Sequence, residues 1–145
     1  MKLRTSLAAA GVAAALGAGA LALPAVASAS SATHTLKFTA VTNKQIMFNQ
    51  TSGGSQETDV NAAGKTIGFD VLYFAAVSPT TGNINVTFDT TGGLLYGTAN
   101  VSIKTNKVTN GKVTGGTGAF AGATGTITAK SAGKNREAIT ITYSG

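Results

Sequence analysis

The feature that most constrains the fold is a run of eleven residues with five glycines, Gly115–Gly125, which reads GGTGAFAGATG. The run cannot be helical, because each glycine in a helix interior costs about 1 kcal/mol relative to alanine. In a β pattern, dense glycine marks tight turns, bulges and places where another backbone comes close. We therefore expect a strand, a kinked corner holding the apolar Phe120, and a second strand.

The chain from residue 34 onward reads as all-β, with Thr, Val, Ile, Phe and Tyr in short runs bounded by Gly, Asn, Ser and Pro. About eight evenly spaced strands without helical periodicity predict a single antiparallel up-and-down barrel. An immunoglobulin-like sandwich is the main alternative, but it leaves the glycine-rich run without a role. The expected strands are His34–Val41, Lys44–Asn49, Thr66–Val77, Asn83–Asp89, Leu94–Ile103, Gly111–Thr114, Ala119–Ala129 and Glu137–Tyr143.

The expected strand Thr66–Val77 is apolar on both faces. Leu72 and Phe74 share one face, and the other carries Ile67, Phe69, Val71 and Tyr73. In a closed barrel one of these faces is the lumen. We expect the outer face to be covered by a loop, a tail or another subunit.

The glycine-rich run resembles the strand-turn-strand signature of the allene oxide cyclase and dirigent barrels, in their exported bacterial branch. In that signature GGTG precedes a small residue, a Phe and a small-residue stretch ending in Gly. Asp59 followed by Gly64–Gly68, and the segment Gly92–Gly97, match further motifs, so that the resemblance covers Lys37 to Tyr143. The signature residues are Gly115, Gly116, Gly118, Phe120, Gly122 and Gly125.

The resemblance implies catalysis by confinement in an apolar pocket, without a cofactor, and a trimer of barrels. Three departures keep either activity from transferring directly. The stretch Leu36–Thr39 offers no carboxylate where the cyclases place one. Lys107–Thr114 is basic and neutral where dirigent proteins often carry acids, and their cysteine pair is absent.

The N-terminal residues 1–29 read as a secretory signal peptide, with a basic start, an uncharged Ala/Gly/Leu stretch, and cleavage after Ala27 or Ala29. A membrane anchor is the weaker alternative, because the stretch is mostly Ala and Gly. We expect a flexible tail at 30–33 and a barrel domain at 34–145. The mature protein is then secreted and extracellular, with no membrane span.

The composition narrows the chemistry. The chain has no cysteine and one histidine, His34, which argues against thiol chemistry and a transition-metal site. Without the signal peptide, nine Lys and Arg face five acids. Lys104, Lys107 and Lys112 gather around one expected hairpin. They could contact an anionic surface or form a solvated tip, but the basic stripe and stacking aromatics of a nucleic-acid binder are missing.

Asp70 is the leading candidate site residue, because it shares a face with Gly68, Leu72 and Phe74. Inside a barrel, desolvation would raise the pKa of this carboxyl, and it could act as a general acid or base or polarise a ligand. The alternative is a structural Asp satisfied by a neighbour. Asp59 is a second catalytic candidate, although loops also favour Asp.

The other acids and the polar aromatics complete the candidate list. We expect Glu57 to be exposed in a Gly/Ser-rich loop, and Asp89 and Glu137 to be solvated at strand ends. Candidate ligand-binding residues are Phe74 and the tyrosines, whose alternative role is core packing with a satisfied hydroxyl. A hydrolase built on His34 has little support, because no G-x-S-x-G elbow exists. The tyrosines are Tyr73, Tyr96 and Tyr143.

Two functions compete on these observations. The first is a secreted barrel that binds a small apolar or phenolic molecule in its lumen and could steer its cyclisation or coupling, as a cofactor-free cyclase or dirigent-like protein. The second is a non-enzymatic structural or interaction module of the cell surface or extracellular matrix. An open lumen with a polar group inside favours the first function; a filled lumen with apolar outer patches favours the second.

Overall fold

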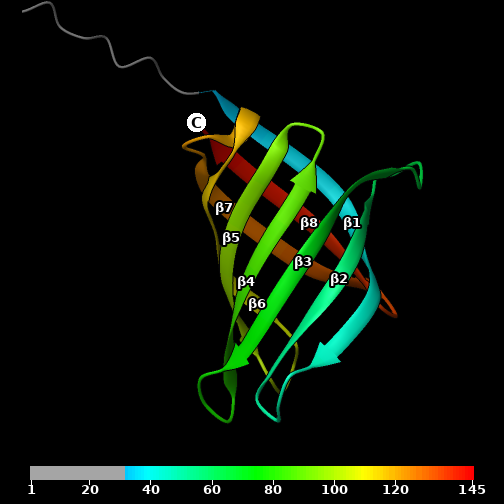
Figure 1. Cartoon of the computed structure of the whole chain (residues 1–145), viewed down its shortest axis with the longest axis vertical. Helices are drawn as coiled ribbons and strands as arrows, with labels where there is room; N and C mark the ends of the chain where they lie inside the picture. The colour runs from blue at the N-terminus through cyan, green and yellow to red at the C-terminus, as the bar shows by residue number, and fades with distance from the viewer. Residues whose placement is uncertain (1–31) are drawn as a thin grey trace, which may run out of the picture.

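The computed structural model describes residues 32–145, so the expected signal peptide lies outside the described residues. Eight antiparallel strands form one closed up-and-down barrel, in which each strand pairs with the next and β8 pairs with β1 (Figure 1). The predicted fold class is therefore confirmed. The elements are β1 (Thr33–Met47), β2 (Ser52–Val60), β3 (Thr66–Ala76), β4 (Thr81–Thr90), β5 (Gly93–Ser102), β6 (Val108–Gly116), the 3-10 helix η1 (Gly118–Phe120), β7 (Thr124–Gly133) and β8 (Arg136–Ser144).

Two strand assignments made from the sequence were wrong. One error adds a strand and the other omits one, so the total of eight strands is unchanged. The segments His34–Val41 and Lys44–Asn49 form the single strand β1, whose pairing with β2 shifts register between Thr42 and Lys44 without ending the strand. The Gly/Ser-rich segment expected as a loop is strand β2. A Cβ atom at Gly53 would lie 2.7 Å from the carbonyl oxygen of Ile46 on β1, so close strand contact favours glycine there.

The glycine-rich run forms the expected strand, corner and strand. Strand β6 ends at Gly116, η1 makes the corner, and β7 begins at Thr124, later than the expected Ala119. Gly118 and Gly122 adopt φ angles of 58° and 77°, which favour glycine. The ring of Phe120 is buried in the corner.

Replacement of Gly125 tests the role of close backbone contact in this run. A Cβ atom here would collide with the carbonyl oxygen of Thr142 and lie 2.7 Å from the Cα atom of Tyr143. We expect Gly125→Ala to lower the free energy of unfolding by about 2 kcal/mol or more, measured by urea denaturation. The control is Gly64→Ala, where φ is +75° but no atom lies within 4 Å of the added Cβ atom. We expect this variant to lose about 1 kcal/mol of unfolding free energy. Equal losses would contradict this account.

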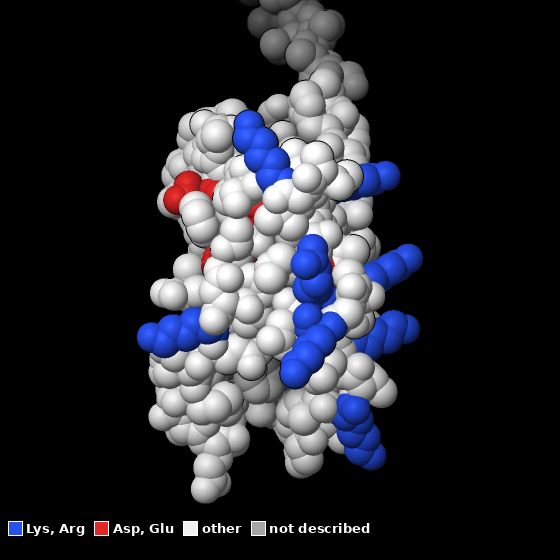
Figure 2. Space-filling model, turned by 90° about the vertical axis from the view of Figure 1, so that its right-hand side faces the viewer, with Lys and Arg blue, Asp and Glu red and all other residues white. Residues whose placement is uncertain are grey.

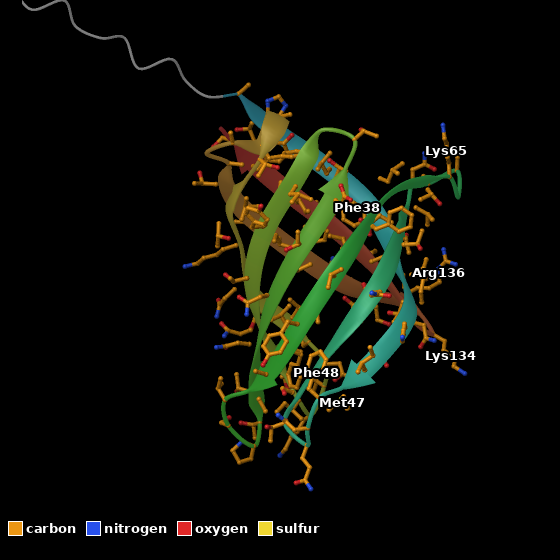
Figure 3. The ribbon with its side chains drawn as sticks, in the orientation of Figure 1. Phe38, Met47, Phe48, Lys65, Lys134 and Arg136 are labelled. Atoms are coloured by element: carbon orange, nitrogen blue, oxygen red, sulfur yellow. The ribbon has the colours of Figure 1, made fainter. Side chains whose placement is uncertain are left out.

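The main hydrophobic core closes one end of the barrel. It joins residues of six strands and η1, and Phe38 lies inside the barrel toward the upper end in Figure 3. A smaller cluster of Ile84, Ala99 and Val101 lies apart from it. Among residues 32–145, no helix is long and apolar enough to cross a membrane. The main cluster consists of Phe38, Ala40, Phe88, Leu95, Val113, Phe120, Ala123, Ile127, Ile139 and Ile141.

The outer face of β3 carries an exposed apolar row, which we call the β3 stripe: Ile67, Phe69, Val71 and Tyr73. Their exposed fractions are 37%, 55%, 57% and 44%. Phe48, near Met47 at the lower end in Figure 3, stacks on Tyr73 with ring centroids 6.1 Å apart. The two apolar faces are as the alternation predicts, but apart from Phe48 on Tyr73 no segment within residues 32–145 covers the stripe.

Candidate functional site

The lumen holds a cavity of about 440 Å³ beside the main core. This volume lies in the range of small-molecule sites, roughly 300–1,000 Å³. Most of the wall is apolar and comes from β3, β4, β5, β7 and β8. The apolar lining includes Leu72, Phe74, Ile84, Val86, Phe88, Ala99, Val101, Ile127, Ala129 and Ile139.

Four carboxyl groups gather on one side of the lumen, and we call them the carboxyl cluster: Glu57, Asp59, Asp70 and Glu137. Glu57 on β2 is directly paired with Asp70 on β3, and both line the cavity together with Glu137 from β8. Asp59 lies two residues beyond Glu57 on β2 and therefore on the same face. Four of the five acids in the sequence thus converge.

The cluster is only partly satisfied by hydrogen bonds. Glu57 Oε1 accepts from the hydroxyls of Thr42 at 3.0 Å and Ser55 at 2.9 Å. Asp59 and Asp70 share a side-chain hydrogen bond. These two residues are only 1% and 3% exposed, yet the Oδ1 atom of each has no hydrogen-bond partner. Buried oxygens without a partner are uncommon, and a catalytic role, an ordered water or a bound ion can account for them.

Burial shifts the protonation of these groups. It raises the pKa of Asp70 to about 9, with repulsion from Glu57 and Asp59 adding to the shift. Burial likewise raises the pKa of Asp59 to about 6, and burial and Glu57 raise that of Glu137. At neutral pH Asp70 therefore carries a proton. A neutral carboxylic acid in an apolar cavity can donate a strong hydrogen bond or act as a general acid.

The cavity opens toward the seam between β6 and β7. These strands pair over only three positions, from Gly111 to Val113, so their remaining parts separate. A second hollow of about 540 Å³ lies there and shares Thr42 and Glu137 with the lumen. Exposed Lys107, Lys130 and Arg136 also line it. In Figure 2 Lys and Arg project from the outer surface, where few acidic atoms are visible.

The structure brings together some of the predicted site residues and separates others. Asp70 and Phe74 line the cavity, and Asp59 adjoins Asp70. Tyr73 belongs to the β3 stripe, and Tyr96 alternates with the inward Leu95 on β5. Among the lumen-lining residues there is no tyrosine.

Tyr143 lies at the closed end of the barrel, away from the cavity. Its ring packs edge-to-face on Phe120 at 5.4 Å and stacks on His34 at 5.3 Å, measured between ring centroids. It is therefore a packing residue of the main core in this structure.

Sequence reasoning misplaced two acids of the site. Glu57 was expected in an exposed loop and Glu137 at a solvated strand end, but both are half-buried and line the cavity. The error for Glu57 followed from reading β2 as a loop. The available signal was the two-residue spacing of Ser55, Glu57 and Asp59, which puts three polar groups on one strand face. Asp89 is exposed, as expected.

Within residues 32–145, no group of three or more His, Cys, Asp or Glu side chains is arranged to hold a metal ion.

Comparison with known proteins gives a structural likeness only. No protein-family model and no curated protein matches the sequence. Among solved structures, a pyocyanin demethylase is similar, with a TM-score of 0.62 and 17% sequence identity; the match covers 77% of this chain and 100% of that chain. At this identity the likeness shows the barrel fold alone.

Proposed function

We propose that this protein is a secreted barrel that binds a small apolar or phenolic molecule in its lumen. The observation that carries the proposal is Asp70, a buried acid with an unpartnered oxygen on the wall of an otherwise largely apolar cavity. The apolar wall would hold the body of the ligand, and the carboxyl cluster would orient its polar end. The similar solved barrel is named as a demethylase of a small molecule, pyocyanin, which supports the proposal of a small-molecule ligand.

The cluster also provides the groups for a cofactor-free reaction. Protonated Asp70 would donate a proton to a bound phenol-derived or enol-like intermediate, and Asp59, whose pKa is about 6, would accept one. Confinement in the cavity would select the reacting conformer. The resemblance of the glycine-rich run to allene oxide cyclase and dirigent barrels supports a cyclisation or coupling reaction of this kind.

Substitution of Asp70 tests its role in binding. We expect Asp70→Asn to weaken the binding of 4-propylphenol about fivefold in isothermal titration calorimetry, because the amide is a weaker donor than the carboxylic acid O–H. The matched control is Asp89→Asn, at the exposed acid on β4. Equal affinity of wild type and Asp70→Asn would remove Asp70 from the site.

The β3 stripe favours a second role, as an interface between copies of this chain. Exposed contiguous apolar surface commonly marks an interaction site. We expect the wild type to form a homo-oligomer, and the double variant Phe69→Lys/Val71→Lys to be a monomer in sedimentation velocity. The control is Thr87→Lys, which is paired with Val71 but lies on β4 outside the stripe. A monomeric wild type at high micromolar concentration would contradict the role.

A further inference from the structure

We infer that the lumen selects a ligand whose inner end is a protonated amine on an apolar body. This inference rests on the proposed function and names the chemical class of the ligand. It follows from three observations about the cavity: its ionisable side chains are all acids, some of their oxygen atoms lack hydrogen-bond partners, and its polar side is separate from its apolar wall.

The ionisable side chains that line the lumen are all acids. Glu57, Asp70 and Glu137 line the cavity from three different strands, and no Lys, Arg or His is among the lining residues. The sequence from residue 32 to 145 nevertheless has more basic than acidic residues. A cationic partner for the cluster is therefore missing from the lumen wall, although buried charges are normally paired.

The free acceptor atoms match an ammonium group. Asp70 Oδ1 is buried without a partner, and the hydroxyls of Thr42 and Ser55 both bond Oε1 of Glu57. Glu57 Oε2 receives no side-chain hydrogen bond within the described residues. An ammonium group has three donors and no acceptor, so it can bond several of these oxygens at once. A hydroxyl group has one donor.

Other ligand classes fit the cluster less well. A carboxylate or phosphate would add a like charge beside Glu57 and Glu137. A metal ion needs a ligand arrangement that the described residues do not form. An apolar molecule without a donor would leave the Asp70 oxygen unpaired. Charge-assisted hydrogen bonds are roughly twice as strong as neutral ones, which favours the amine over an alcohol of the same shape.

The cationic residues at the β6–β7 seam do not compensate the cluster. Lys107, Lys130 and Arg136 are exposed to solvent, and water and salt screen exposed charges. Their repulsion would slow the approach of an amine more than it would weaken the bound state. The seam itself would accommodate a neutral or anionic outer end of the ligand.

Three probes with one apolar body test the inference: 4-phenylbutylamine, 4-phenylbutan-1-ol and 4-phenylbutanoate, titrated by calorimetry at neutral pH. We expect the amine to bind at least about tenfold more tightly than the alcohol, and the acid most weakly. In Glu57→Gln the ratio of amine to alcohol affinity, both measured on the same variant, should fall to within about twofold of one. Asp89→Asn is the control, and Glu137→Gln is the second variant if Glu57→Gln does not fold.

The outcomes separate the two proposals. Equal affinities for the amine and the alcohol would overturn the inference and leave lumen binding intact. An amine preference that persists in both Glu57→Gln and Glu137→Gln would also overturn it. No binding of any probe at millimolar concentration would overturn lumen binding itself.

Discussion

The free energy of unfolding of the ligand-free barrel should fall by about 3 kcal/mol or more as the pH rises from about 4 to about 9. Burial raises the pKa of Asp70 to about 9 and that of Asp59 to about 6, from 3.8. An acid with a raised folded-state pKa binds its proton more tightly when folded. It therefore contributes stability below its unfolded pKa, and this stability is lost as the pH passes the folded pKa.

Thermal unfolding measured across this pH range tests the prediction, and the loss corresponds to a melting temperature lower by roughly 10 °C. Asp70→Asn should remove most of the pH dependence, because the amide does not ionise. Asp89→Asn should keep the wild-type profile, since Asp89 is exposed. A stability that increases between pH 4 and pH 7 would show that the buried carboxyls are ionised and paired in the folded protein.

Filling the lumen should abolish ligand binding without unfolding the barrel. Ala129 lines the cavity from β7, so Ala129→Phe would place a ring in the space that the ligand needs. We expect the affinity for 4-propylphenol to fall at least about tenfold in calorimetry. The free energy of unfolding should change by no more than about 3 kcal/mol.

The matched control is Ala138→Phe on β8. Ala138 is exposed and is paired with Lys130, the neighbour of Ala129 on β7, so the added ring points to solvent. Its affinity should equal that of the wild type. If Ala129→Phe bound the phenol as tightly as Ala138→Phe, the ligand would have to bind outside the lumen, and the β3 stripe would be the next place to examine.

Local pattern was sufficient for the fold and for Asp70. The glycine-rich run permits few structures other than a strand, a corner and a strand, and the short runs of β-forming residues predict the remaining strands except β2. Alternation along β3 put Asp70 on the face of Leu72 and Phe74, and that face is the lumen. These inferences depend only on residues that are close together in the sequence, so the sequence alone is enough to make them.

The rest of the site depends on pairing between distant segments. Glu57, Asp70 and Glu137 meet only because β2 pairs with β3 and β1 lies between β2 and β8. In β2 the sequence also hides the strand, since Gly53 and Gly54 are small where neighbouring backbone comes close. The Gly/Ser-rich composition of β2 is typical of a loop, but here it reflects the close packing of neighbouring strands.

The alternation of side chains along a strand shows which face a residue lies on, but not its position along the barrel axis. Tyr143 lies on the inward face of β8, as expected, but next to the buried Phe120 at the closed end. Phe74, on the inward face of β3, reaches the cavity instead. The extent to which the core fills the lumen depends on side chains from all eight strands, and the sequence of one strand does not contain it.

The most direct test of the central claim is a crystal structure of the protein with bound 4-propylphenol. The account predicts that the ligand lies in the lumen between Phe74 and Ile139, with its hydroxyl within hydrogen-bond distance of Asp70 or another member of the carboxyl cluster. A lumen that excludes the ligand, with the phenol bound only at the β3 stripe, would contradict it.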